Sequence, residues 1–418
     1  MKKIAIIGSG ISGLSTAYQL HNDYDITIFE KNDYFGGHTD THSLFVDEKE
    51  VQVDSGFIIF CPEFYPHFSS MLNALQVDSQ ATDMSFSAHN RKTGLVYNAT
   101  SLNKLFCQRK NLIKPSFYRM LFDIVRFYRT SIKVLKADDG TTSVKRYLDD
   151  NNYSQSFKQD HLLPMISALW SATPERVEQF PIRHLVEFFE RHGLLKLGNR
   201  PQWQVVKNGS ASYIHALQKQ LRCQWRNNSA VTQVARTQSN VHITSNGETE
   251  TFDAVVFATH SDQTLKMIAT PSDQEQRILS AIEFERNHVV VHTDDSIMHP
   301  NKRSWASWNT EVPNEYDTVT QRCCTANYWM NALQSLPITT NVFTTLNSNH
   351  KIKPEKILLE RDYAHPIFTA QSIAAQQDKT LIDGQNLSYF VGAYWGWGFH
   401  EDGARTAFEV SQLIRAQV

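Results

Sequence analysis

The segment that most limits the fold is a glycine-rich stretch near the N-terminus, GSGISG over residues 8–13. The apolar run at 3–7 predicts a buried parallel strand, residues 14–20 predict a helix, and residues 25–30 predict a second strand. This is the GxGxxG pattern in a complete β-α-β setting, which binds a dinucleotide at its first turn. The sequence therefore predicts an α/β fold with a Rossmann-like domain.

Each glycine of this segment has its own task in such a turn. Gly8 permits the tight turn, Gly10 lets the backbone approach a pyrophosphate, and Gly13 lets the helix pack closely on the strand. The pyrophosphate would lie at the helix N-terminus, beside the N–H groups of Ile11 and Ser12, where the helix dipole favours negative charge. We expect these five residues to contact the cofactor.

An acidic residue closes the second predicted strand. Glu30 stands 20 residues after Gly10, where a carboxylate accepts hydrogen bonds from the hydroxyls of an adenosine ribose and repels a 2′-phosphate. NADP is therefore disfavoured. Glu30 and the next residue, Lys31, are candidate cofactor-binding residues.

A double glycine follows in the segment Gly36-Gly37-His38-Thr39. It resembles the second block of FAD-binding oxidoreductases of the amine oxidase and glutathione reductase type, in which the chain wraps the diphosphate and ribityl groups. The resemblance implies FAD as the cofactor and these four residues as contacts. Amine oxidases usually carry Arg where this chain has His38, so His38 is either a neutral donor to a phosphate or a solvent-exposed bystander.

A further glycine-rich turn lies near the C-terminus. Residues 389–394 predict a strand ending in Gly392, and residues 405–414 predict a helix after the turn. Amine-oxidase-like flavoproteins place such a helix with its N-terminus at the flavin N1–C2=O edge, where reduction builds negative charge. Family members often have Glu at the position of Ala393, so the segment is a variant. The resemblance places Gly392, Gly403 and Ala404 at the cofactor.

Two shorter segments resemble other FAD contacts of this superfamily. Residues 230–236 predict a strand whose early valine, Val231, resembles one with a backbone contact to adenine. Residues 252–262 predict a buried strand and a turn beside FAD, which implies contacts from Ala258 to His260.

Over residues 4–414 the chain resembles the flavin-containing amine oxidase superfamily and, within it, a bacterial branch described as predicted NAD/FAD-binding proteins. The segments GGHTDT, VDSGFIIF, ALWSATP and GFHEDGARTA carry this resemblance. It implies a discontinuous FAD-binding domain (1–75, 200–265 and 380–418) and an inserted α+β substrate domain (76–199 and 266–379). Flavoprotein relatives of this branch act on lipid acyl chains as desaturases and double-bond isomerases, which favours a hydrophobic or lipid substrate.

Composition excludes several other classes. The 41 Lys and Arg residues and 43 Asp and Glu residues give a net charge of −2, which argues against a nucleic-acid binder. The five cysteines have no CxxC spacing, so we expect free thiols in a reducing cytoplasm. We interpret the run after Lys2 and Lys3 as a strand rather than a signal peptide. No stretch reaches the roughly 18 apolar residues that span a bilayer, and the expected location is cytoplasmic.

Residues 104–136 stand out by charge, because they hold nine Lys or Arg residues and one acid, Asp123. The segment thus carries +8 and the rest of the chain −10. A helix from Pro115 would place one apolar stripe opposite a basic face that includes Phe122. Two interpretations stay open: a membrane-surface helix that admits an acyl substrate, or an ordinary amphipathic helix with a solvated basic face. The stripe comprises Phe117, Leu121, Ile124, Tyr128 and Leu135, and the opposite cations are Arg119, Arg126, Arg129 and Lys133.

The candidate catalytic residues are Tyr394, Trp397 and His400. Tyr394, Trp395 and Trp397 could form aromatic walls at the flavin or pack around the turn. His400 with Glu401 could exchange a proton, or both could be helix-start residues. Asp54 is expected to support the structure beneath FAD, and Trp170 and Ser171 to line the substrate cavity. The remaining aromatic residues of the second insertion are expected in its core: Trp305, Trp308, Tyr328 and Trp329.

Flavin chemistry requires only a substrate C–H held against flavin N5 and charge stabilisation at N1–C2=O. The sequence has no HExxH or metal-ligand cluster and no second GxGxxG, so we expect no metal and a hydride from the substrate. No Cys or His lies in a recognisable flavin-linkage motif, so we expect non-covalent FAD. The leading function is an FAD-dependent oxidoreductase acting on a hydrophobic or acyl-lipid molecule. The alternatives are an amine oxidase that produces peroxide, a double-bond isomerase, and a flavin-binding scaffold for a lipid-modifying partner.

Overall fold

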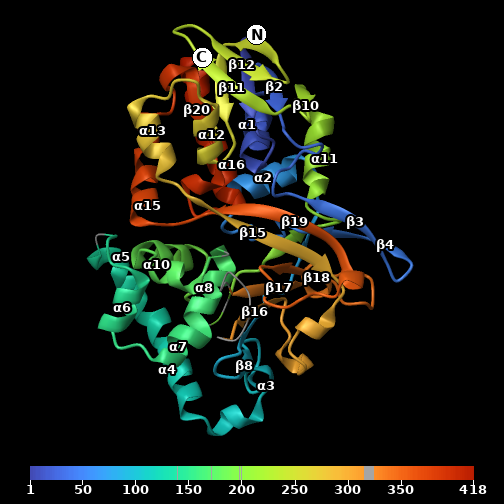
Figure 1. Cartoon of the computed structure of the whole chain (residues 1–418), viewed down its shortest axis with the longest axis vertical. Helices are drawn as coiled ribbons and strands as arrows, with labels where there is room; N and C mark the ends of the chain where they lie inside the picture. Colours follow the sequence, from blue (N-terminus) through green and yellow to red (C-terminus); the bar gives the residue numbers. More distant parts are fainter. Residues whose placement is uncertain (139, 171, 197, 199, 315–323) are drawn as a thin grey trace.

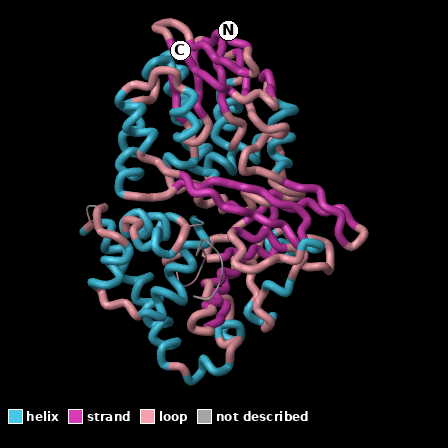
Figure 2. The backbone as a smooth tube through the Cα atoms, viewed as in Figure 1, coloured by secondary structure: helices cyan, strands magenta, loops and turns pink. Residues whose placement is uncertain are grey.

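The computed structural model describes residues 1–418 except 139, 171, 197, 199 and 315–323. Figure 1 shows an upper part that holds both termini and a parallel sheet, and a lower part with helices and a second sheet. The long strands β15 (Phe284–His292) and β19 (Ile357–Pro366) lie between them, as Figure 2 also shows.

The sheet of the upper part has five parallel strands in the order β10-β2-β1-β14-β20. In β1, Ile4 and Ile6 pack into the core on one face, whereas Ala5 and Ile7 pack into the core on the other. Both faces are therefore buried, as is usual for parallel sheets. The strands are β1 (Lys3–Ile7), β2 (Asp25–Phe29), β10 (Cys223–Arg226), β14 (Ala254–Phe257) and β20 (Ser388–Phe390).

Helices cover one face of this sheet: α1 (Ile11–Leu20), α2 (Pro66–Ala74), α11 (Ala211–Gln220) and α16 (His400–Gln417). A three-stranded sheet and shorter helices cover the other face: β11 (Val231–Arg236), β12 (Val241–Ser245), β13 (Glu248–Phe252), α12 (Ser261–Met267), α13 (Asp273–Ser280) and α15 (Ala370–Gln377). The predicted Rossmann-like α/β fold is confirmed.

The sheet of the lower part has the order β19-β15-β18-β17-β16-β7-β8, in which only β16 and β7 run parallel among the described strands. Helices beside it enclose a separate core around Phe127, Phe157 and Phe189. The domain boundaries given above stay a prediction. The strands are β7 (Phe86–Asn90), β8 (Leu95–Asn98), β16 (Trp308–Val312), β17 (Thr325–Trp329) and β18 (Phe343–Leu346), and the longer helices are α4 (Pro115–Thr130), α6 (Val144–Asp150), α8 (Leu163–Trp170) and α10 (Ile182–Arg191).

Short strands connect the two parts: the hairpin β3 (Thr41–Val46) with β4 (Lys49–Asp54), and β5 (Ile59–Phe60), β6 (Ser79–Ala81) and β9 (Gln204–Val206). Asp54, at the end of β4, is fully buried and accepts hydrogen bonds from Ser210 N and Gln334 Nε2 at 3.0 and 2.8 Å. It therefore joins the start of α11 to the lower part, in agreement with a structural role.

Two predicted elements differ at their ends. The strand that ends in Gly392 stops at Phe390, because Ala393–Trp395 forms a 3-10 turn. The last helix begins at His400 rather than 405, because the Asp402 carboxylate folds back to accept hydrogen bonds from Phe399 N and Trp397 N at 3.1 and 3.0 Å. A side chain that closes the first turn in this way starts a helix early.

Helix α4 starts at Pro115 as predicted, but its buried face is rotated. Asp123 is fully buried, with Arg126 at 2.9 Å and Arg119 at 3.4 Å. Three members of the predicted stripe, Leu121, Ile124 and Leu135, are only half-buried, although each packs against a neighbouring core. Paired cations satisfy the buried carboxylate, a pairing that an apolar pattern does not reveal. The buried residues are Phe117, Met120, Asp123, Phe127 and Tyr128.

The four predicted aromatic residues of the second insertion pack in cores of the lower part, as expected, and two of them also line a cavity. Trp305 packs edge-on to Trp329, with ring centroids 5.6 Å apart. Tyr328 is buried in a core cluster against which Trp308 packs, and both rings also line the cavity described below. The four described cysteines are free, and Cys323 lies outside the described residues. None of the described helices is long and apolar enough to cross a membrane.

Candidate functional site

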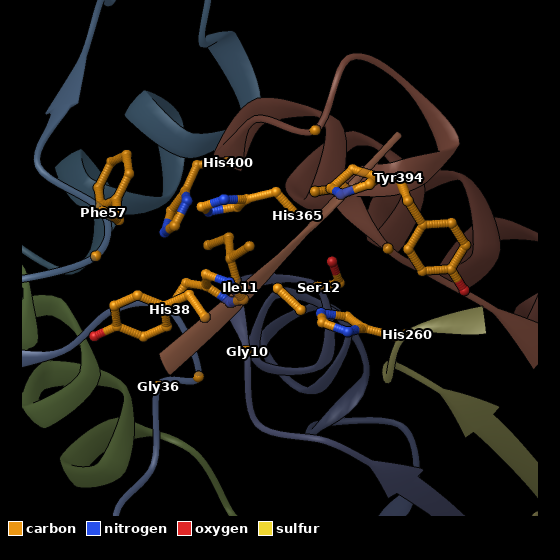
Figure 3. Close-up of a pocket in the computed structure, with 18 of the residues that line it drawn as sticks. Gly10, Ile11, Ser12, Gly36, His38, Phe57, His260, His365, Tyr394 and His400 are labelled. Carbon is orange, nitrogen blue, oxygen red and sulfur yellow. The ribbon is translucent and has the colours of Figure 1, made fainter. Parts of the chain in front are cut away.

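A cavity of about 1020 Å³ lies where the carboxyl ends of the parallel strands meet β15 and β19. Ligands of α/β sheets bind at this edge of the sheet. Segments distant in the sequence line it, among them the β1–α1 turn, the segment after Gly36, and β19 (Figure 3). Both parts of the molecule therefore contribute to one site.

The glycine turn is shaped by close backbone contacts. A Cβ on Gly13 would lie 2.0 Å from the carbonyl oxygen of Gly8, so only glycine allows α1 to pack here. A Cβ on Gly10 would meet nothing within 4 Å, because this residue faces the cavity. Gly8, Gly10, Ile11 and Ser12 line the cavity and Gly13 does not. Since Gly10 has no side chain to cap α1, the first N–H groups of the helix are available to an anion.

Glu30 is buried at the cavity wall and organises the loops around it. Its carboxylate accepts hydrogen bonds from Ser9 N and Asn32 N, both at 3.0 Å, and from Ser9 Oγ at 2.6 Å. Ser9 Oγ in turn accepts one from Gly36 N at 3.2 Å. A carboxylate can accept about four hydrogen bonds, so Glu30 keeps capacity for a ribose hydroxyl. Lys31 also lines the cavity.

The Gly36–Thr39 segment brings a neutral imidazole to the cavity. Burial lowers the pKa of His38 below 6.5, and its Nε2 has no hydrogen-bond partner among the described residues. The ring is half-buried and lines the cavity with Gly36 and Gly37. A buried polar atom without a partner suits a ligand that accepts a hydrogen bond. Thr39 does not line the cavity; its hydroxyl lies 3.1 Å from His400 Nε2.

The C-terminal turn supplies several of the predicted residues. Gly392, Tyr394, Trp397 and His400 line the cavity. Trp395 packs in the core beside Tyr394 and does not line it, so its suggested place in an aromatic wall was wrong. Gly403 and Ala404 lie off the cavity, in the contact of α16 with α1. A Cβ on Gly403 would lie 2.7 Å from Ser12 Oγ, which makes Gly403 a packing residue.

His400 lies at the start of α16 and is neutral. Its ring stacks on Phe57 with centroids 3.4 Å apart, and its Nε2 lies 3.3 Å from the Tyr213 hydroxyl. Burial holds its pKa well below 6.5, so it cannot supply an imidazolium proton near neutral pH. Glu401 points away from the cavity and caps α2, accepting hydrogen bonds from His67 N and Phe68 N at 3.0 Å each. A shared acid–base role of His400 and Glu401 has no geometric support.

Two rings of β19 at the site were not predicted from the sequence. Tyr363 and His365 lie 5.0 and 5.5 Å from His38, between ring centroids, and line the cavity. Figure 3 shows His38, His365 and His400 gathered near the glycine turn. Arg361, Tyr363 and His365 alternate along the strand, so strand periodicity was a signal that could have placed them on one face. Val231, Ala258, Thr259 and His260 line the cavity too.

The side of the cavity formed by the lower part is apolar and aromatic. Trp170 Nε1 donates to the Trp397 carbonyl at 2.9 Å, which fixes the Trp170 indole at the wall. The prediction for Ser171 concerns a residue outside the described part of the chain. The apolar lining includes Met84, Leu169, Phe188, Leu194, Trp308 and Tyr328.

Charges along the wall are unequal. The cations Lys31, Lys266, Arg286 and Arg361 line the cavity, whereas Glu30 is the only buried carboxylate among the described lining residues. The other lining acid, Asp362, is exposed. Cations and a helix N-terminus favour a bound diphosphate, so the residues present fit FAD.

Fold and cavity together define a flavin-binding protein in which a second sheet closes the dinucleotide site. A family model described as flavin containing amine oxidoreductase matches residues 11–361, and the chain belongs to this family. The protein is therefore an FAD-dependent oxidoreductase.

Solved structures share the fold over nearly the whole chain. A fatty acid isomerase from P. acnes that produces CLA has a TM-score of 0.68 at 14% identity, covering 99% of this chain and 98% of its own. Cyclohexylamine oxidase from Brevibacterium oxydans IH-35A has a TM-score of 0.70 at 14% identity, covering 99% of both chains.

By sequence, a short segment of the chain is similar to a 1-hydroxycarotenoid 3,4-desaturase from Flavobacterium sp. (strain P99-3). The two are 58% identical over 38 residues, only 9% of this chain and 8% of the desaturase.

Proposed function

We propose that the enzyme oxidises a hydrophobic or acyl-lipid substrate, passing a hydride from a substrate carbon to flavin N5. The observation that carries this proposal is the apolar side of the cavity, which includes Met84, Phe188 and Tyr328. This side has no buried carboxylate among its described residues. A buried ammonium without a paired acid is strongly disfavoured. An uncharged acyl chain has no charge to desolvate at this wall, and the burial of its apolar surface stabilises the complex.

Tyr394 and Trp397 are proposed to orient the substrate as parts of the cavity wall. The Trp397 Nε1 is buried without a hydrogen-bond partner among the described residues, so it can donate to a polar group of a ligand. His400, being neutral, is proposed to position the start of α16 through its contacts with Phe57 and Thr39. FAD is the electron acceptor.

The similar proteins named above differ in the substrates that their names give. The isomerase and the desaturase named above are, by their names, a fatty acid and a carotenoid enzyme, and this favours the lipid proposal. The cyclohexylamine oxidase favours the amine alternative by name. The test must therefore separate oxidation of a lipid, isomerisation of a lipid and oxidation of an amine.

The FAD-loaded enzyme is mixed anaerobically with an unsaturated phospholipid and, separately, with a polyamine. We expect the lipid alone to bleach the flavin absorbance and to yield a product lighter by two hydrogens. Lipid turnover without a mass change identifies an isomerase, and bleaching by the amine alone overturns the proposal.

A matched pair of variants tests the apolar wall. Leu194 lines the cavity, and its neighbour Leu195 is equally half-buried but does not. Leu194→Glu should slow lipid-dependent bleaching by about tenfold or more, because a carboxylate must then be desolvated or displace the chain. Leu195→Glu should leave the rate within about twofold of the wild type, since a side chain outside the cavity lining does not meet the substrate. Equal rates in both variants would contradict the assignment of this wall.

A further inference from the structure

Exposed hydrophobic side chains gather in one short stretch of the lower part. Of ten large hydrophobic side chains that are well exposed among the described residues, five fall within residues 102–122. Ile113 is 86% exposed, Leu102 75% and Phe122 58%. Isolated exposed hydrophobes are normal on a protein surface, but a gathering of them indicates a contact surface. The five are Leu102, Leu112, Ile113, Tyr118 and Phe122, here called the 102–122 patch.

The charge of this patch has one sign. No acidic residue occurs in the sequence between Asp83 and Asp123, and Asp123 itself is buried against Arg126 and Arg119. A second chain segment adds exposed Lys302 and Arg303 beside α3 (Leu102–Leu105), since Asn301 Nδ2 donates to the Cys107 carbonyl at 3.0 Å. The cations within the patch are Lys104, Arg109, Lys110, Lys114 and Arg119.

The patch rests on an ordered base. The Tyr118 hydroxyl donates to the Leu112 carbonyl at 2.9 Å, and Phe106 packs edge-on to the buried Phe117, with ring centroids 5.5 Å apart. These contacts order the base of the patch, and Leu102, Ile113 and Phe122 stay exposed above it. Figure 1 shows α3 and the first turns of α4 at the lower end of the molecule, far from the parallel sheet.

We propose that the 102–122 patch docks the enzyme on an anionic phospholipid bilayer. Lys and Arg at the rim would meet the lipid phosphates, and Ile113, Leu112 and Phe122 would enter the headgroup–acyl boundary. Aliphatic side chains that project between cations suit a lipid surface better than a nucleic acid. A nucleic acid binds cations through its phosphates and stacks its bases on aromatic rings, and neither contact needs exposed aliphatic side chains. The surface is the tip around the start of α4, not the whole basic face of that helix. This proposal does not depend on the substrate of the enzyme.

The test is cosedimentation of the FAD-loaded enzyme with vesicles of phosphatidylcholine alone or with 30 mol% phosphatidylglycerol. We expect binding to the anionic vesicles that weakens as salt rises, because exposed charges are screened. Ile113→Asp/Phe122→Asp should lower the partition coefficient by about tenfold or more. The matched control, Phe45→Asp/Leu381→Asp, changes two exposed hydrophobes outside the patch and should bind like the wild type.

Flavin absorbance and thermal denaturation verify that all variants are folded and loaded. Equal binding of the patch and control variants would overturn the proposal, as would absence of binding to anionic vesicles. A wild-type dimer that the patch substitutions dissociate, without vesicle binding, would assign the patch to a second copy of the chain instead. Because the readout is sedimentation, the result is independent of the proposed lipid oxidation.

Discussion

Substitutions at two glycines of the same turn should have different effects, one on packing and the other on cofactor binding. Gly13→Ala should lower the free energy of unfolding by about 1–3 kcal/mol, because its Cβ would lie 2.0 Å from the Gly8 carbonyl oxygen. Gly10→Ala should leave the fold intact, since its Cβ meets open space, and should weaken FAD binding by about tenfold or more, because the Cβ keeps the pyrophosphate from the backbone N–H groups. Chemical denaturation without FAD and fluorescence titration with FAD measure the two effects. An unfolded Gly10→Ala variant would contradict the separation.

At this scale the sequence predicted residues whose task depends on local geometry. The glycine turn and Glu30 follow from spacing alone, because their neighbours in space are neighbours in the β-α-β unit. Tyr363 and His365 were missed because β19 reaches the cavity from the other sheet, more than 300 residues after the glycine turn. Trp395 was misassigned for a related reason: in a tight turn, adjacent aromatic side chains point to different surroundings, and only packing decides which of them meets the cavity.

The junction of α2 and α16 predicts a pH dependence of stability. Burial raises the pKa of Glu401 to about 7 while it caps α2; its unfolded value is near 4.5. Between these values the folded state binds more protons than the unfolded state, so this group's contribution to stability is full below pH 4.5 and is lost as the pH rises to about 7. Glu401→Gln should flatten that decline. Urea denaturation at several pH values checks this, and an unchanged slope would contradict it.

Helices and strands were predictable where hydrophobic periodicity dominates and less so where a polar side chain decides. The early start of α16 depends on Asp402 turning back to the Trp397 and Phe399 amides. The face that α4 buries depends on Asp123, which two arginines make tolerable in the core. In both helices the deciding residue is a buried aspartate, although aspartates are usually exposed. A hydrophobic pattern does not predict a buried carboxylate.

Residues from two sheets line the cofactor site, so the cations that neutralise the diphosphate of FAD can come from either sheet. The position where amine oxidases usually have Arg holds His38, whose lowered pKa keeps it neutral. A diphosphate at the start of α1 must therefore be neutralised by cations elsewhere on the wall. Arg361 is already paired with Asp40 at 2.8 Å and Lys266 with Asp262 at 3.6 Å, which leaves Lys31 and Arg286 as the candidates on the wall.

Arg286 is the more informative of these two, because it lies on β15 and so belongs to the second sheet. Arg286→Gln should weaken FAD binding by about threefold to tenfold and reduce its salt dependence, a modest effect because the side chain is exposed and screened. Arg222→Gln removes an exposed arginine of the upper part that does not line the cavity and should bind FAD like the wild type. Fluorescence titration of the apoprotein at low and high salt measures both variants. Identical affinities would mean that β15 closes the cavity without neutralising the cofactor, and that the helix N-terminus and Lys31 carry the diphosphate charge alone.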